Sequence, residues 1–465
     1  MREIYQYMKT KISKRPVLLL IVIFLLSRLI VYFSGVSYDA DLFNWAPQLI
    51  DTELLKHDLW RSLWYMHGQP PLYNLYNGLI LQTFPQSYNF VFFIISMLMS
   101  LAHVVMLYKS MILLGLRNII SFGMAVFYLL SPAAILYEHW HYYSHWEIFF
   151  ITGATFFLAK FLLSEKSIYI NLFFCFIGLL VLSRSMFHLG WYVIIVAGLL
   201  LFLQKHRKVI LKSMFVPLLL IILWYGKNHY LYGKFTASTW LGMNMARIVE
   251  PGQGIGQIPT LEKLDAYWPY IEKDERFSNI PLLQNLEKAN GKHNFNNINY
   301  IKVSDAYTTV CLLEIKQDPF RYIKRVGHAI LNYFEPTSGY FWVLGNREKI
   351  AYYAVLYDFT FINILGNKLF GEAFMHAAFI PLLVNMLIYI FAIWLFFQSR
   401  KKKTFNKHQI LIAGFLLYNI IYVFAVSNLV EYGENNRFRF ATFPATIMLC
   451  GLLIQSLTRK NKSKT

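Results

Sequence analysis

Ten apolar segments constrain what this chain can fold into. Several run for about 18 residues or more, which is the length that an α-helix needs to cross a bilayer. The chain is 57% hydrophobic and only 15% charged, whereas an average soluble domain is roughly 25% charged. We therefore expect an all-α polytopic membrane protein with about ten transmembrane helices. The expected spans are 17–34, 88–108, 119–137, 147–163, 168–183, 187–204, 209–225, 374–398, 409–427 and 438–457.

Lysine and arginine residues gather between alternate apolar segments. The net charge of +19 would by itself also suit a nucleic-acid-binding protein. However, the basic residues cluster in 2–15, 109–117, 160–166, 205–208, 400–403 and 459–464, while 138–146 and 428–437 hold almost none. Basic segments of membrane proteins tend to stay in the cytoplasm. This pattern predicts a multi-pass membrane protein with both termini cytoplasmic, and it disfavours a nucleic-acid partner. We expect the membrane to be the bacterial inner or plasma membrane.

The spacing of the spans divides the chain into three parts. An N-terminal transmembrane module, 1–225, includes a first outer loop at 35–87. Residues 226–373 form a long extracytoplasmic region that we expect to carry interfacial helices, and 374–465 return to transmembrane helices. The three cysteines, Cys175, Cys311 and Cys450, are scattered, which argues against a disulfide framework or a zinc site.

The first outer loop opens with two carboxylates directly after the first span. Asp39 and Asp41 stand in the stretch S-Y-D-A-D-L-F, and Tyr38 precedes them. Solvated loop acids are the simplest interpretation. Further along, W-Y-M-H-G-Q-P-P-L-Y places His67 and Gln69 before a proline pair, which fixes backbone angles and keeps the turn stiff. The alternative interpretation is that Asp39 and Asp41 are catalytic and that the stiff turn belongs to the same site.

A histidine-rich segment fills the next outer turn. Residues 131–147 hold Glu138, His139, His141, His145 and Glu147 among aromatic residues, with no lysine or arginine. On a helix, His141 and His145 would share a face. Three interpretations stay open: a metal site, an aromatic belt at the membrane surface, and a lining for a substrate.

Arginines occupy positions where a membrane protein seldom places them. Arg437 and Arg439 begin the final expected span, and Arg28 lies inside the first. A guanidinium offers a planar fork that suits phosphate, and an intramembrane cation is a functional candidate. Alternatively, the late pair binds Glu431 and Glu434, and Arg28 extends to the membrane surface. Arg184, in a very short outer turn, is a weaker candidate.

The motifs resemble those of GT-C superfamily glycosyltransferases that use polyprenyl-phosphate sugars. In pattern they are nearest to protein O-mannosyltransferases and to bacterial lipid A aminoarabinose transferases. Y-D-A-D resembles the acidic pair of the first outer loop, although the acids are separated here, and H-G-Q-P-P-L-Y resembles a proline-pair motif. Lys227 begins K-N-H-Y-L-Y-G, where arginine is usual. The other matching stretches are S-T-W-L-G-M-N at 238–244, K-Q-D-P-F-R-Y at 316–322 and G-E-N-N-R-F-R-F at 433–440.

The resemblance implies an inverting glycosyltransferase. It would move a sugar from a polyprenyl-phosphate carrier to a hydroxyl of a glycan, lipid or protein outside the cytoplasm. Asp39 would deprotonate or orient that hydroxyl, with Asp41 as orienter or alternative base, and Glu138 as a candidate second acid. The cations Arg437, Arg439, Arg28 and Lys227 would stabilise the phosphate, while Tyr38, His67, Gln69, His139 and His141 would line the substrate site.

A metal and other classes of protein remain as alternatives. The D-x-D pattern suits a divalent cation such as Mg²⁺ or Mn²⁺, but no complete ligand set is visible in the sequence. An O-antigen polymerase or ligase would also have many spans and outer arginines, and it generally lacks acids directly after the first span. A lipid-sugar transporter would place ionisable residues along mid-membrane helices. A membrane scaffold without catalytic activity is the third alternative.

Overall fold

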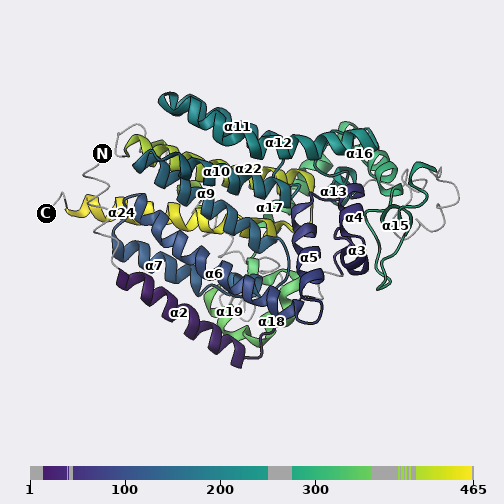
Figure 1. Cartoon of the computed structure of the whole chain (residues 1–465). Coiled ribbons are helices and arrows are strands. Elements are labelled where there is room, and N and C mark those ends of the chain that lie inside the picture. Colours follow the sequence, from purple (N-terminus) through teal and green to yellow (C-terminus); the bar gives the residue numbers. More distant parts are fainter. Residues whose placement is uncertain are drawn as a thin grey trace.

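Long helices lying side by side form the body of the protein (Figure 1). The computed structural model describes residues 14–38, 40, 45–249, 275–358 and 405–462, with isolated helical residues between 386 and 398. These ranges contain no strand, and β pairing is confined to isolated bridges such as that between Glu287 and His293. The predicted all-α class is therefore confirmed for the described part of the chain.

Nine of the ten predicted spans coincide with described helices. Five are long and apolar enough to cross a membrane, and a bent pair of helices adds a sixth. The tenth predicted span, 374–398, lies mostly outside the described residues. The five are α2 (Lys14–Phe33), α6 (Tyr88–Leu113), α9 (Ser144–Ser164), α12 (Arg207–Tyr232) and α22 (Lys407–Val430); the pair is α7 (Asn118–Leu129) with α8 (Pro132–Glu138); shorter apolar helices are α10 (Ser167–Ser183), α11 (Leu189–Phe202) and α24 (Phe443–Lys462).

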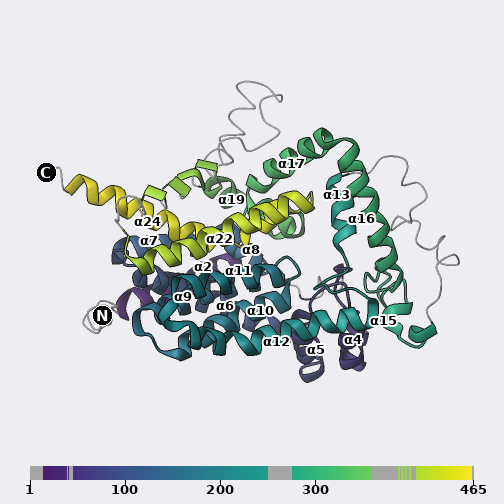
Figure 2. The ribbon, with the colours of Figure 1, turned by 90° about the horizontal axis from the view of Figure 1, so that it is seen from above.

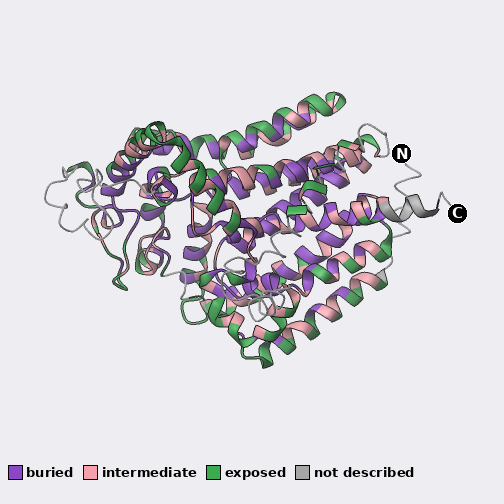
Figure 3. Cartoon of the chain, turned by 180° about the vertical axis from the view of Figure 1, so that it is seen from behind, coloured by how far each residue is buried: buried purple, intermediate pink, exposed green. Residues whose placement is uncertain are grey.

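Helix α9 occupies the centre of the bundle. Of its apolar window 72% is buried, against 22% for each of the outer helices α2 and α12, and Figure 3 shows exposed residues, in green, along those two flanks. α9 packs on α6, α10, α22 and α24. A Cβ on Gly153 of α9 would lie only 2.1 Å from Cε1 of Phe176 in α10, so glycine permits their close approach.

The break between α7 and α8 has a local cause. Pro132 is the first residue of α8, and it cannot donate a backbone hydrogen bond to continue α7. Ser131 caps the new helix by accepting from the Ala134 N–H at 3.1 Å. The chain bends there by 56°. A second difference from the predicted spans follows Val430, where a short polar helix, α23 (Asn435–Phe440), precedes α24.

The two predicted outer regions fold together at one end of the bundle, opposite the end where α2 begins and α24 ends (Figures 1 and 2). Many hydrogen bonds join them, among them Lys288 Nζ to Ala46 O at 2.6 Å, Ala289 N to Asp51 Oδ2 at 2.6 Å, and Phe295 N to Pro47 O at 3.1 Å. The first region supplies α3 (Thr52–His57), α4 (Leu59–Tyr65) and α5 (Leu72–Thr83); the second supplies α13 (Leu241–Val249), α15 (Pro281–Gln284), α16 (Asn299–Gln317), α17 (Pro319–Phe334), α18 (Leu344–Lys349) and α19 (Ala351–Tyr357).

Candidate functional site

A cavity of about 430 Å³ lies where the predicted outer segments meet the helix ends. The first outer loop, the α10–α11 turn, the chain from the end of α12 to α13, and the segment from the end of α22 into α23 all contribute side chains. The lining combines amides, aromatic rings, two arginines and two glutamates. Its members are Gln48, Gln69, Arg184, Ser185, Met186, His188, Leu189, Gly190, Tyr225, Thr236, Ala237, Ser238, Trp240, Leu241, Asn244, Val426, Ser427, Val430, Glu431, Glu434, Arg437 and Phe438.

Arg184 enters the cavity from the C-terminal end of α10. The side chain is 7% exposed, and Nε lies 3.4 Å from Oε1 of Glu147. Its guanidinium carbon lies 4.2 Å from the ring centroid of Tyr143. Nε and Nη1 make no hydrogen bond within the described residues. Buried guanidinium donors are nearly always satisfied, so this side chain can bind an acceptor that the described residues do not supply.

Arg437 enters the cavity from α23. Its Nη2 makes a close ion pair with Oε2 of Glu434, and the guanidinium carbon lies 4.8 Å from the Phe438 ring and 5.2 Å from the Tyr142 ring. Nε is buried without a hydrogen bond among the described residues. Tyr143 and Phe438 also flank Arg184, so one aromatic group packs beside both cations.

Two carboxylates, Glu431 and Glu434, also line the cavity. Arg247 of α13 donates through Nη1 to Glu431 Oε1 at 2.6 Å and to Glu434 Oε1 at 3.3 Å. Burial, aided by the negative charge of Glu434, raises the pKa of Glu431 to about 7. Burial acts in the same direction on Glu434, but the charges of Arg437 and Arg247 outweigh it and lower the pKa of that carboxyl. One acid of the pair is thus held ionised while the other titrates near neutral pH.

Amide side chains of the first outer loop form another wall. Gln69 donates through Nε2 to Gln48 Oε1 at 3.1 Å, and the same oxygen accepts from the Tyr143 hydroxyl at 3.1 Å. The proline pair after Gln69 ends the turn, and α5 begins at Leu72. Trp240 stacks on Phe295, with ring centroids 4.1 Å apart. This wall offers polar groups and an aromatic surface, a combination suited to a sugar.

The structure brings only some of the predicted site residues into this cavity. Gln69 and Arg437 line it. The predicted catalytic pair, Asp39 and Asp41, lies outside the described residues, although Tyr38 and Ala40 are described. Arg439 donates through Nη2 to the Glu335 carbonyl at 2.7 Å and does not belong to the lining.

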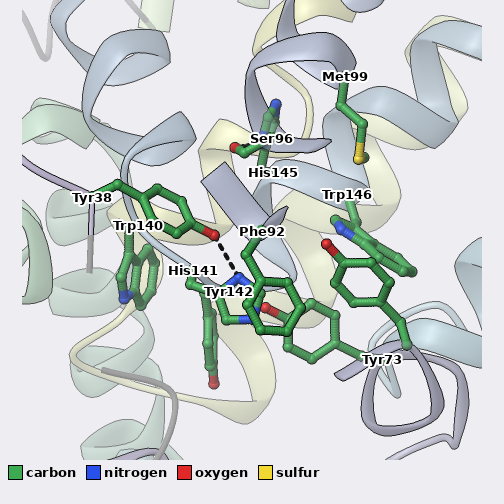
Figure 4. A pocket seen from close by; sticks show the side chains of 11 residues that line it. Tyr38, Tyr73, Phe92, Ser96, Met99, Trp140, His141, Tyr142, His145 and Trp146 are labelled. Carbon is green, nitrogen blue, oxygen red and sulfur yellow. Dashed lines mark hydrogen bonds between the residues drawn. The ribbon is translucent and has the colours of Figure 1, made fainter. Parts of the chain in front are cut away.

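The histidine-rich segment surrounds a second, much smaller pocket (Figure 4). Its volume is about 10 Å³, which holds one water molecule at most. The Tyr38 hydroxyl and His141 Nδ1 are 2.7 Å apart, and His141 Nε2 lies 3.0 Å from Asn77 Oδ1. Burial lowers the pKa of His141 to about 3, so it stays neutral. Because α9 begins only at Ser144, His141 precedes the helix, and the shared helical face expected with His145 does not form.

Two more predicted residues bind each other. Arg28 and Glu138 form a bidentate ion pair, with Nε–Oε1 at 2.6 Å and Nη2–Oε2 at 2.8 Å, and Arg28 Nη1 donates to Leu129 O at 2.8 Å. His139 Nδ1 lies 2.8 Å from Ile135 O. All of these contacts are internal to the bundle.

His67 and Lys227 join the two outer regions. His67 is fully buried, with Nδ1 at 2.7 Å from Thr239 Oγ1 and Nε2 at 2.9 Å from Asn296 O. Lys227 Nζ donates to the carbonyl of neighbouring Met66 at 2.6 Å. These contacts hold the turn before the proline pair in place, and thereby position Gln69 at the cavity.

Metal ligands are not assembled in the described part of the chain, where no group of three or more His, Cys, Asp or Glu side chains is close enough to hold an ion. The predicted divalent-cation site at Asp39 and Asp41 falls outside the described residues.

Three residues of the cavity, Arg184, Glu431 and Glu434, are less conspicuous in the sequence than in the structure. Arg184 stands in a short turn and was only a weak candidate, while Glu431 and Glu434 were considered solely as partners for the late arginines. Arg184 is the only lysine or arginine between Lys166 and Lys205. An isolated arginine at the end of an apolar segment, in a turn without other lysine or arginine residues, is the sequence signal that could have identified Arg184.

No model of a known protein family matches the chain, and no curated protein matches its sequence. A search of solved structures returns two crystal structures of the oligosaccharyltransferase of Archaeoglobus fulgidus, one tethered to an acceptor peptide and one in complex with Zn and sulfate. Identities are 14% and 13%, TM-scores 0.45 and 0.44, and coverage is 94% and 93% of this chain. The chain spans about half of those proteins, 49% in each case.

Proposed function

We propose that the protein is a GT-C-type inverting glycosyltransferase that moves a sugar from a polyprenyl-phosphate carrier to an acceptor hydroxyl on the extracytoplasmic side of the membrane. The observation that carries this proposal is the cavity of about 430 Å³ into which Arg184 and Arg437 bring buried donors without hydrogen bonds. That volume falls in the usual range for small-molecule sites.

Phosphate is the anion that best fits these arginines. A guanidinium binds phosphate through paired N–H donors, and the charge that develops on the departing phosphate is stabilised best by donors already in place. Arg437 is partly neutralised by Glu434, whereas Arg184 Nε lies 3.4 Å from Glu147 Oε1 and makes no hydrogen bond among the described residues. Arg184 is therefore the first choice as phosphate ligand, with Arg437 beside it.

The sugar would occupy the amide and aromatic wall. Gln48, Gln69 and Asn244 offer amides for sugar hydroxyls, and the indole of Trp240 offers a flat apolar face. A hexose or a pentose fits this chemistry equally well.

The reaction is a single displacement. The acceptor oxygen forms a bond to the anomeric carbon from the face opposite the phosphate, while the bond between that carbon and the phosphate oxygen breaks. The electron pair leaves with the phosphate, a stable anion that needs no proton. The proton of the acceptor hydroxyl goes to a carboxylate, and Asp39 deprotonates or orients that hydroxyl, with Asp41 as the alternative.

Transfer from defined donors tests the function. The full chain in liposomes is supplied with polyprenyl-phosphate pentose or hexose and with glycan, lipid and peptide acceptors, and products are detected by mass spectrometry. We expect a glycosylated acceptor and free polyprenyl phosphate in equal amounts. Asp39→Asn should lower the rate by about 10²–10⁴-fold. Failure of the wild-type chain to transfer any lipid-linked sugar would refute the function. Wild-type rates for both Asp39→Asn and Asp41→Asn would refute only their assignment.

A further inference from the structure

Glu431 lines the cavity, and one of its carboxylate oxygens accepts no hydrogen bond from the described residues. The residue follows the last residue of α22 and is 8% exposed. Arg247 holds Oε1 at 2.6 Å, while no described residue donates to Oε2. The side chain lines the same cavity as Arg184, whose Nε and Nη1 also lack hydrogen bonds among the described residues. A buried carboxylate anchored at one oxygen and open at the other is arranged to accept a proton.

The other carboxylates near the cavity are engaged differently. Glu434 uses both oxygens, Oε1 toward Arg247 and Oε2 toward Arg437. Glu147 faces Arg184 and does not line the cavity. Among the described acids of the cavity, Glu431 alone combines a fixed position with an oxygen open to a substrate.

We propose that Glu431 is the proton acceptor for the attacking hydroxyl in this cavity. This assignment rests on the glycosyl transfer proposed above and specifies which carboxylate removes the proton, a role that the proposed function leaves open. Glu431 Oε2 takes the proton as the acceptor oxygen bonds to the anomeric carbon and the phosphate leaves with the electron pair of the broken bond. The proton afterwards passes to water.

Several charged groups face Glu431 and set its proton affinity. They are Glu434 from the turn before α23, Arg247 from α13, Arg437 from α23 and Arg184 from the α10–α11 turn. Burial and Glu434 raise the pKa of Glu431 to about 7, against the three arginines. A base with a pKa near the working pH combines a large ionised fraction with good proton affinity.

The pH profile of transfer by the full chain in liposomes tests this role. Wild-type kcat/KM should rise about tenfold per pH unit up to about pH 7 and then level off, because only ionised Glu431 accepts a proton. Glu431→Gln should lower the rate at pH 8 by about 10²–10⁴-fold and abolish the acidic limb. Glu431→Asp should retain the limb. Glu348→Gln, at an exposed position in α18, is the matched control and should behave as wild type.

A second variant keeps the test independent of folding defects at position 431. Glu434→Gln removes the neighbouring negative charge, so the midpoint of the acidic limb should move to lower pH. An unchanged midpoint, or a Glu431→Gln chain that binds donor and retains both rate and acidic limb, would overturn the role of Glu431. In either case wild-type transfer would still support the proposed function, whereas absence of wild-type transfer would refute the function itself.

Discussion

Two groups of buried charges in this protein look alike in sequence and differ in structure. Arg28 and Glu138 join α2 to the broken span α7–α8, and every nitrogen atom of the guanidinium has a hydrogen-bond partner: two carboxylate oxygens, a serine hydroxyl and the Leu129 carbonyl. Arg184 and Arg437 line a cavity instead, and three of their buried nitrogen atoms have no hydrogen-bond partner among the described residues.

The difference shows how a structural arginine is told from one that is ready to bind a ligand. Both groups are buried and both include glutamates, so burial and charge do not separate them. Hydrogen-bond saturation does, because a saturated ion pair has nothing left to offer a substrate. The comparison predicts that changes at Arg28 affect stability, whereas changes at Arg184 affect catalysis.

The largest effect is expected from breaking the ion pair between Arg28 and Glu138. Arg28→Leu leaves Glu138 buried without its partner, which typically costs about 3–5 kcal/mol of unfolding free energy. The rate per folded molecule should stay close to wild type. Thermal unfolding in detergent measures the first quantity, and transfer normalised to folded protein measures the second.

A double variant separates pairing from packing. Arg28→Leu with Glu138→Leu removes both charges, so most of the lost stability should return, since apolar replacement of both partners is often neutral. A double variant that folds well and transfers no sugar would show that Arg28 and Glu138 take part in catalysis, and the contrast between the two groups would be wrong.

The next largest effect is expected at Arg184, which lines the cavity. Arg184→Gln removes preorganised donors from the departing phosphate, so kcat should fall by about 10²–10³-fold, as for the loss of one oxyanion donor. Steady-state transfer rates measure this loss. Arg61→Gln is the matched control, because Arg61 is exposed and paired with Asp58. A wild-type kcat for Arg184→Gln would remove Arg184 from the phosphate site.

Hydropathy predicted most of the fold because the bilayer imposes the length of each span. The start of the last predicted span, at 438, differs from the structure, where α24 begins at Phe443, and the reason is local. Asn435 donates through Nδ2 to Ser427 O at 2.9 Å and to Glu431 O at 3.1 Å, and these bonds hold α23 as a separate short helix. Side-chain bonds to the end of a preceding helix have no signature in hydropathy.

The site was less predictable because long-range pairings decide it. Gln69 and Arg437 were expected and line the cavity. Arg28 and Glu138 stand 110 positions apart, and nothing in either local motif indicates that they bind each other. His67 was expected to line the substrate site, yet its partners Thr239 and Asn296 belong to the other outer region. Composition identifies candidate residues, but only tertiary contacts tell which keep unsatisfied groups.

The smallest expected effect is on stability, at His67, which lies in the outer regions and not in the helix bundle. Burial, with a smaller effect of the Lys227 charge, lowers the pKa of His67 from 6.5 to about 3. Between these values the unfolded chain binds the proton and the folded chain does not, so acidification favours unfolding. At pH 5 this lowers the free energy of unfolding by about 2 kcal/mol.

His67→Asn should be less stable than wild type at pH 7. On going from pH 7 to pH 5, its free energy of unfolding should fall by about 2 kcal/mol less than that of wild type. The control His57→Asn, at a 77% exposed side chain, should follow wild type. Because His67 is saturated as Arg28 is, kcat per folded molecule should not change; an acid sensitivity equal to that of wild type would mean that His67 is not held neutral by the fold.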